Sequence, residues 1–224
     1  MTIHRAMART GRQRPFVLSF LVALALMICV ERGHAAGTAQ ITVAGGCFWC
    51  VESDFETVDG VIFAVSGYTG GSTQDPSYKQ VTSGRSGHYE AVQITCDPGV
   101  ISARELYDLF FRSVASTDAV GQFCDRGDSY RTAIFASAND RAAAEAAKAA
   151  ARSALGETVV TPILGEGEFW KAELIHQGYY KSNKITVTRF GPLTRAKAHK
   201  RYRAGCGRDA RVQGLWGDAA PFIN

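Results

Sequence analysis

Apolar residues after position 40 recur with two different spacings. From Phe48 to Val58 they are three and four residues apart, which places them on one face of a helix that begins at Cys47 and ends at Gly60. Shorter runs of alternating or continuous apolar residues are typical of strands. The predicted strands are 41–44, 61–68, 88–95, 130–136 and 158–164, and two further helices are predicted from the capping box at Ser102 and over the Ala-rich run 138–154.

The order β-α-β-β-α-β-α-β predicts the fold class. It indicates an α/β protein of the α+β type, a two-layer sandwich with helices packed on one mixed sheet and a ferredoxin-like core. A long irregular C-terminal segment, 165–224, follows and carries a basic stretch from Arg189 to Arg211. The loop 72–87 is long for a compact domain, and long loops are often functional.

The first 36 residues have the pattern of a signal peptide. Four arginines and no acid precede an apolar run, 16–30, and small residues follow before Gly37. We therefore expect residues 1–36 to be a signal peptide and 37–224 to be a single catalytic domain of an exported, periplasmic or secreted protein. The alternative is an uncleaved membrane anchor through 16–30, although that run is short for a spanning helix.

The positive net charge of the chain belongs to its first 36 residues. The whole chain has a formal net charge of +4, but residues 1–36 contain five basic residues and one acid, so 20 of each remain in 37–224. A neutral body gives no electrostatic reason to expect nucleic acid as a partner. We expect the remaining 188 residues to form a monomer with a single core.

Cysteine usage points to redox chemistry. Cys29 belongs to the predicted signal peptide, which leaves five cysteines: Cys47, Cys50, Cys96, Cys124 and Cys206. Because five is odd, at least one thiol is free or is used in turn, whereas cysteines of exported proteins usually form stable pairs.

The strongest local signal is Gly45-Gly46-Cys47-Phe48-Trp49-Cys50. Its glycines allow a tight turn between strand and helix, and Cys47 then lies at a helix N-terminus, where a thiol loses its proton more easily. Cys50 follows three residues later on the same face. The alternative is a pair of buried structural cysteines, while the scattered other cysteines disfavour zinc.

Glu90 lies in the strand 88–95, in phase with the core residues Val92 and Ile94. We expect it to be half-buried at the rim of the sheet, where desolvation would keep its carboxyl protonated for use as a general acid. From the strand alone, the alternative stays open that Glu90 is an acidic residue at the end of the sheet without a functional role.

Several motifs together resemble the A-type peptide methionine sulfoxide reductases. In order they are Gly46-Cys47-Phe48-Trp49, Ser66-Gly67-Tyr68-Thr69-Gly70-Gly71, Pro76-Ser77-Tyr78, Gly87-His88-Tyr89-Glu90-Ala91-Val92, the run from Gln122 to Arg131, and Gly205-Cys206-Gly207-Arg208. The resemblance covers about residues 41–217. It implies a two-layer α/β core, reduction of the S epimer of methionine sulfoxide in oxidised proteins, and no metal or organic cofactor.

The resemblance also implies roles for residues at matching positions. They are the nucleophile Cys47, the proton donor Glu90, the oxygen-holding Tyr78 and Tyr130, the orienting Asp125, and Phe48 and Trp49 around the methyl group on sulfur.

After the attack, Cys47 would become a sulfenic acid that a second thiol converts to a disulfide. Cys206 matches the resolving position of the family and is preferred, because a disulfide between Cys47 and Cys50 would strain a regular helix. Many family members have Gly where this chain has Cys50, so Cys50 stays an alternative. No chemistry of their own is predicted for Cys96 and Cys124.

The expected reductant is a thioredoxin or a thioredoxin-like protein, which would exchange thiols with the disulfide. Two rival hypotheses stay open at this point. A general disulfide oxidoreductase would need only Cys47 and Cys50, and a non-enzymatic module would bind oxidised methionine without turnover.

Overall fold

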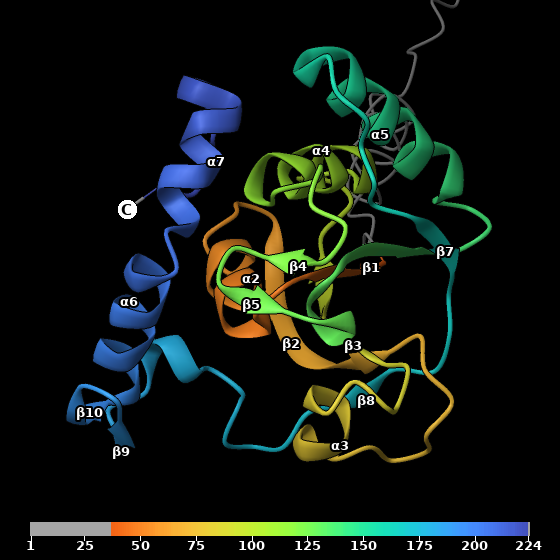
Figure 1. The fold of residues 1–224 in the computed structure, drawn as a ribbon. Coiled ribbons are helices and arrows are strands. Elements are labelled where there is room, and N and C mark those ends of the chain that lie inside the picture. Colours follow the sequence, from red (N-terminus) through yellow and green to blue (C-terminus); the bar gives the residue numbers. More distant parts are fainter. Residues whose placement is uncertain (1–36, 224) are drawn as a thin grey trace, which may run out of the picture. The chain divides into compact units, whose positions relative to one another are not determined.

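A six-stranded mixed sheet forms the centre of the computed structural model, which describes residues 37–223 (Figure 1). The predicted signal peptide, with its possible anchor 16–30, lies outside the described residues. Across the sheet the strands are β7 (Ile163–Gly165), β6 (Thr132–Ala136), β1 (Ala39–Gly45), β3 (Tyr89–Cys96), β2 (Val61–Thr69) and β8 (Trp170–Lys171). Only β6 and β7 are parallel, and the order β6-β1-β3-β2 confirms the predicted ferredoxin-like core.

Three helices pack on this sheet: α2 (Phe48–Phe55), α4 (Ala103–Ser113) and α5 (Arg141–Leu155). Helix α4 begins with the predicted capping box, in which the Ser102 side chain accepts from the Glu105 N–H and the Glu105 carboxylate accepts from the Ser102 N–H. The main apolar core is closed by large side chains from α2, α4 and the central strands. They include Phe48, Val51, Phe55, Val92, Ile94, Leu106, Phe110 and Ile134.

Some predicted boundaries differ from the structure. The predicted loop 72–87 contains a short helix, α3 (Tyr78–Thr82), and the predicted strand 158–164 is ordered as a strand only over β7. A tight hairpin, β4 (Gly121–Gln122) and β5 (Asp125–Arg126), precedes the turn η1 (Asp128–Tyr130). The segment after β8 holds η2 (Tyr179–Lys181), β9 (Ile185–Thr188) and β10 (Gly191–Thr194).

The prediction of a long irregular C-terminal segment is wrong for its second half. Residues there form α6 (Arg195–Gly205), α7 (Arg208–Trp216) and the turn η3 (Gly217–Ala219). The sequence of α6 is polar on every face, so it lacks the apolar periodicity that identifies a helix. Tertiary contacts hold it instead, and α6 and α7 stand together along one side of the domain, beside α2 (Figure 1).

A buried ionic cluster anchors these two helices. Arg203 in α6 donates to the Asp54 carboxylate at 2.6 Å, and Arg208 at the start of α7 lies 3.7 Å from the same carboxylate. Arg208 also donates to the backbone oxygens of Gly45 and Ser113. Burial of Asp54, which is 4% exposed, raises its pKa to about 6 against the opposing effect of the two arginines. The cluster fixes the chain on both sides of Cys206 against α2.

Within residues 37–223, no helix combines the length and apolar character needed to cross a membrane.

Candidate active site

The start of α2 is shaped by a close approach of the β4–β5 hairpin. Gly46 has φ +79, and a methyl group there would come within 2.6 Å of the Gln122 Cβ, so only glycine fits. The Gln122 side chain in turn bonds both the N–H and the C=O of Ala115, which fixes the hairpin. Cys47 follows as the N-cap residue of α2, the helix start at which the sequence predicted it, and its side chain is partly exposed.

Cys47 and Cys50 share a hydrogen bond and titrate together. The bond lowers the pKa of Cys50 and raises that of Cys47, because the thiol that keeps its proton donates to the thiolate. His199 and Arg208 lower the Cys50 pKa further, whereas burial and Glu90 raise that of Cys47. These directions run against the expectation of a lowered pKa at Cys47, because burial and the hydrogen bond with Cys50 oppose the effect of the helix start.

Glu90 in β3 lies under the first turn of α2. Its Oε2 accepts the Phe48 N–H at 3.1 Å, whereas its Oε1 has no partner with good hydrogen-bond geometry, although Tyr130 lies close enough to lower the Glu90 pKa. The expected half-buried position is wrong, because Glu90 is only 1% exposed. Burial raises its pKa to about 8, against the opposing Phe48 N–H, so the carboxyl is largely protonated at neutral pH.

Two tyrosines from separate segments reach the same site. Tyr78 begins α3 and Tyr130 ends η1, and a hydrogen bond joins their hydroxyl groups. Burial, followed by the nearby Glu90, raises the pKa of both phenols, which keeps them protonated as donors. Asp125 in β5 also faces this region, and burial raises its pKa.

An aromatic wall closes the opposite side. Phe48 is buried and packs against Tyr78, with ring centroids 6.2 Å apart. Trp49 is partly exposed and stacks on Tyr179 at 3.7 Å, with the rings nearly parallel. His176 packs against both Phe48 and Trp49, at 5.3 and 5.7 Å.

All nine residues predicted for the site line one cavity of about 450 Å³. They are Cys47, Phe48, Trp49, Cys50, Tyr78, Glu90, Asp125, Tyr130 and Cys206. Sequence reasoning missed Tyr179 and His199, which also line it, and Glu173, which accepts from the Tyr78 N–H and the Tyr68 hydroxyl at 2.8 Å. These three lie in the segment after 165, whose mixed sequence gave no periodic signal.

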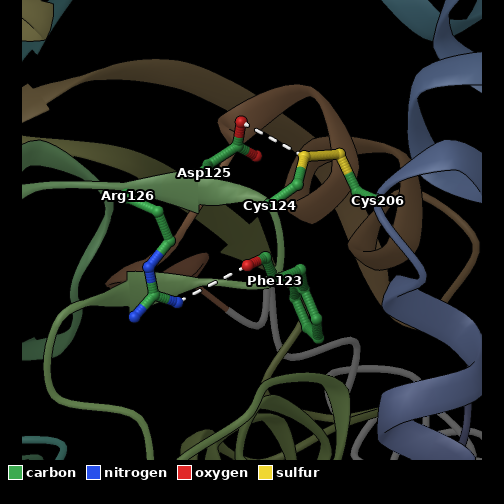
Figure 2. Close-up of a disulfide and its surroundings, with 5 residues drawn as sticks. All are labelled: Phe123, Cys124, Asp125, Arg126 and Cys206. Carbon is green, nitrogen blue, oxygen red and sulfur yellow. Dashed lines mark hydrogen bonds between the residues drawn. A yellow bond between two sulfur atoms is a disulfide. The ribbon is translucent and has the colours of Figure 1, made fainter.

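A disulfide joins Cys124 to Cys206 at the edge of the cavity (Figure 2). The sequence did not predict this pairing of Cys124 with Cys206. Cys124, Asp125 and Cys206 are also the one cluster of potential metal ligands among residues 37–223, but the bond between the two sulfurs leaves no free thiolate. Cys96 is buried in the core, away from this cavity.

A dithiol at a helix start that faces a protonated carboxyl group and two phenols defines the class, a thiol-dependent oxidoreductase. The sequence model of the family "Peptide methionine sulfoxide reductase" matches residues 39–204. The chain belongs to this family, and it is a peptide-methionine (S)-S-oxide reductase.

Individual relatives agree with this assignment. The chain is 43% identical over 206 residues to peptide methionine sulfoxide reductase MsrA 2 of Rhizobium meliloti, covering 91% of this chain and 95% of that protein. It is 43% identical over 180 residues to the MsrA of Bacillus subtilis, covering 79% and 94%. The crystal structure of reduced Mxr1 from Saccharomyces cerevisiae matches with a TM-score of 0.61 and 32% identity, over 65% of this chain and 85% of that one. The resemblance to the A-type family is thereby confirmed.

Proposed function

We propose that Cys47 attacks the sulfur of methionine sulfoxide while Glu90 protonates its oxygen. The single observation that carries this proposal is that Glu90 is bonded to the backbone beside Cys47, within the same cavity. The carboxyl group of Glu90 binds the backbone N–H of the residue next to Cys47, and both side chains line one cavity. The sulfoxide loses its oxygen to Cys47, methionine leaves, and Cys47 becomes a sulfenic acid.

Cys50 supplies the base for this attack. Its lowered pKa makes it the thiolate of the pair, and its hydrogen bond to Cys47 gives the proton a direct path. As Cys47 bonds to sulfur its proton passes to Cys50, which is the activation that a weakly ionised nucleophile needs.

The remaining side chains hold the substrate. The hydroxyls of Tyr78 and Tyr130 donate to the sulfoxide oxygen, beside the unpartnered Oε1 of Glu90. Phe48 and Trp49 form the apolar wall for the methyl group, and Trp49 is held in place by Tyr179. Asp125 orients the tyrosine hydroxyls from the rim.

Cys206 resolves the sulfenic acid. Its thiol attacks the Cys47 sulfur, water leaves, and a disulfide forms between the two cysteines. A thioredoxin or a thioredoxin-like protein then restores the thiols by exchange and is itself oxidised. The substrates are oxidised proteins, so the physiological role is protein repair.

Cys206→Ser tests this sequence of steps. With the S epimer of N-acetyl-methionine sulfoxide, we expect the variant to accumulate the Cys47 sulfenic acid, trapped by dimedone, and wild type to leave the R epimer unreduced. Turnover with a protein dithiol should fall by at least about tenfold, because the reductant must then react directly with the oxidised sulfur of Cys47, which is half-buried in the cavity. A Cys206→Ser enzyme that turns over at the wild-type rate would instead assign resolution to Cys50.

Residues 1–36 support export of the enzyme, by their charge and apolar pattern. We expect the mature protein from the exporting cell to begin near Gly37, measured by intact-mass spectrometry, and to occur in the periplasmic or secreted fraction. Recovery of the full-length chain with the membranes would show that 16–30 is an anchor. In an oxidising compartment the thioredoxin-like reductant must draw its electrons from across a membrane.

A further inference from the structure

We propose that Cys124 is the entry point for the external reductant and that the Cys124–Cys206 disulfide is the last oxidised form of the catalytic cycle. This inference rests on the proposed function of Cys47 and Cys206. The observation is that the predicted resolving cysteine is bonded to Cys124, 82 residues away in sequence, while Cys47 and Cys50 are free thiols in the same cavity.

The structure brings Cys124 to Cys206 by defined contacts. Cys124 lies in the two-residue turn of the β4–β5 hairpin, after Phe123, whose φ of +55 is unusual for an aromatic residue. The guanidinium of Arg208 lies 4.8 Å from the centre of the Phe123 ring, so one contact links a neighbour of Cys124 to the second residue after Cys206. Arg126 and Asp118 tie the base of the hairpin by an ion pair of 2.6 Å.

The Cα atoms of Cys124 and Cys206 are 4.8 Å apart, within the usual range for a disulfide. Exchange between these two sulfurs therefore needs no movement of the backbone that carries them. Residues after Cys206 are fixed by the buried Arg208, which is 2% exposed, so the pairing is built into the fold rather than left to a mobile tail.

Exposure favours Cys124 as the sulfur that a protein reductant attacks. Cys124 is exposed, whereas Cys206 is half-buried and Cys50 is buried. An external thiolate must approach the attacked sulfur along the disulfide axis, which only the exposed side permits for a whole protein.

The steps balance. After resolution, the Cys124 thiolate attacks the Cys206 sulfur of the Cys47–Cys206 disulfide, that bond breaks, and Cys47 leaves as a thiolate with the electron pair. A dithiol protein then attacks Cys124, forming a mixed disulfide and releasing the Cys206 thiolate. Its second thiol attacks its own bonded sulfur, frees Cys124, and leaves the reductant as a disulfide. Two electrons and two protons pass from the reductant to the enzyme.

The number of methionines formed without any reductant tests this proposal. Fully reduced wild type, mixed with excess S-sulfoxide, should form two methionines per enzyme, because the move of the disulfide to Cys124 frees Cys47 for a second attack. Cys124→Ser should form one and stop with a Cys47–Cys206 disulfide. The matched control Cys96→Ser, which removes a thiol outside the cavity, should again form two. Peptide mapping of wild type after a single equivalent of sulfoxide should find Cys124 bonded to Cys206.

Each outcome decides something different. One methionine from wild type, with Cys47 still bonded to Cys206 in the peptide map, would overturn the proposal and make the observed disulfide a structural staple. Two methionines from Cys124→Ser would transfer the role to Cys50. No methionine from wild type would reject the proposed function itself. With a protein dithiol as reductant, we expect turnover of Cys124→Ser to fall by at least about tenfold, because the reductant must then reach the less exposed Cys206.

Discussion

Replacing Cys47 by serine is expected to abolish reduction of the S epimer of methionine sulfoxide. The thiol takes the sulfoxide oxygen by becoming a sulfenic acid, and a serine hydroxyl group cannot be oxidised in this way, so the loss should be on the order of 10⁴-fold or more. The assay is methionine formation from each epimer of N-acetyl-methionine sulfoxide, with dithiothreitol as reductant. Dithiothreitol is small enough to bypass the docking of a protein reductant, so it isolates the chemistry at Cys47.

Cys96→Ser is the matched control, because it removes a buried thiol of the core that does not line the cavity. It should keep the wild-type rate. The Cys47→Ser enzyme should still bind the S epimer, since Phe48, Trp49 and the two tyrosines are unchanged. Binding can be followed by tryptophan fluorescence, because Trp49 is the one of the chain's three tryptophans that lines the cavity. Residual turnover above a tenth of the wild-type rate would mean that another thiol, most directly Cys50, attacks the sulfoxide.

Glu90→Gln should have the second-largest effect. The amide keeps the size of the carboxyl group and can accept the Phe48 N–H, but it has no proton to give to the sulfoxide oxygen. The single-turnover rate should fall by about 10² to 10⁴-fold, the usual contribution of a general acid. Wild type should lose activity as pH rises through about 8, where Glu90 ionises, and the glutamine variant should lack this alkaline limb.

Stability gives an independent readout of the same proton. The pKa of Glu90 is raised in the folded state, so its contribution to stability is fully present below the ordinary value of 4.5 and is lost as pH rises through about 8. The glutamine variant does not ionise, so it should lose less stability than wild type between pH 5 and pH 9. Denaturant unfolding across this range measures the difference. Equal slopes for the two proteins would show that Glu90 is ionised when folded, and it could not then be the acid.

The central fold was predictable because its signals are local. The apolar face of α2 and the capping box of α4 each depend on residues close in sequence. Helix α6 was not predictable in this way. Its buried Arg203 is stabilised by Asp54, 149 residues earlier, and no pattern within 195–205 reports such a partner.

The active site likewise has features that local sequence predicts and features that only the fold determines. Cys47 was predicted from the glycine turn that precedes a helix, and Glu90 from its position in the alternation of a strand. The protonation of both side chains depends on neighbours that only the fold brings together. The sequence places Cys47 at a helix start, yet in the fold the hydrogen bond with Cys47, together with His199 and Arg208, lowers the pKa of Cys50. Cys124 is the clearest case, because nothing in the sequence near it points to Cys206.

The size of the cavity has a consequence for which damaged proteins are repaired. A space of about 450 Å³ closed by aromatic rings receives a side chain, not a folded segment, so the target methionine must project from its own backbone. An oxidised methionine in a packed core becomes a substrate only when its surroundings open. For such a residue the observed repair rate is the intrinsic rate multiplied by the open fraction, so it reports the target's local opening free energy. We therefore expect the enzyme to repair loosely structured proteins first, and a slowly repaired methionine to mark a region that rarely unfolds.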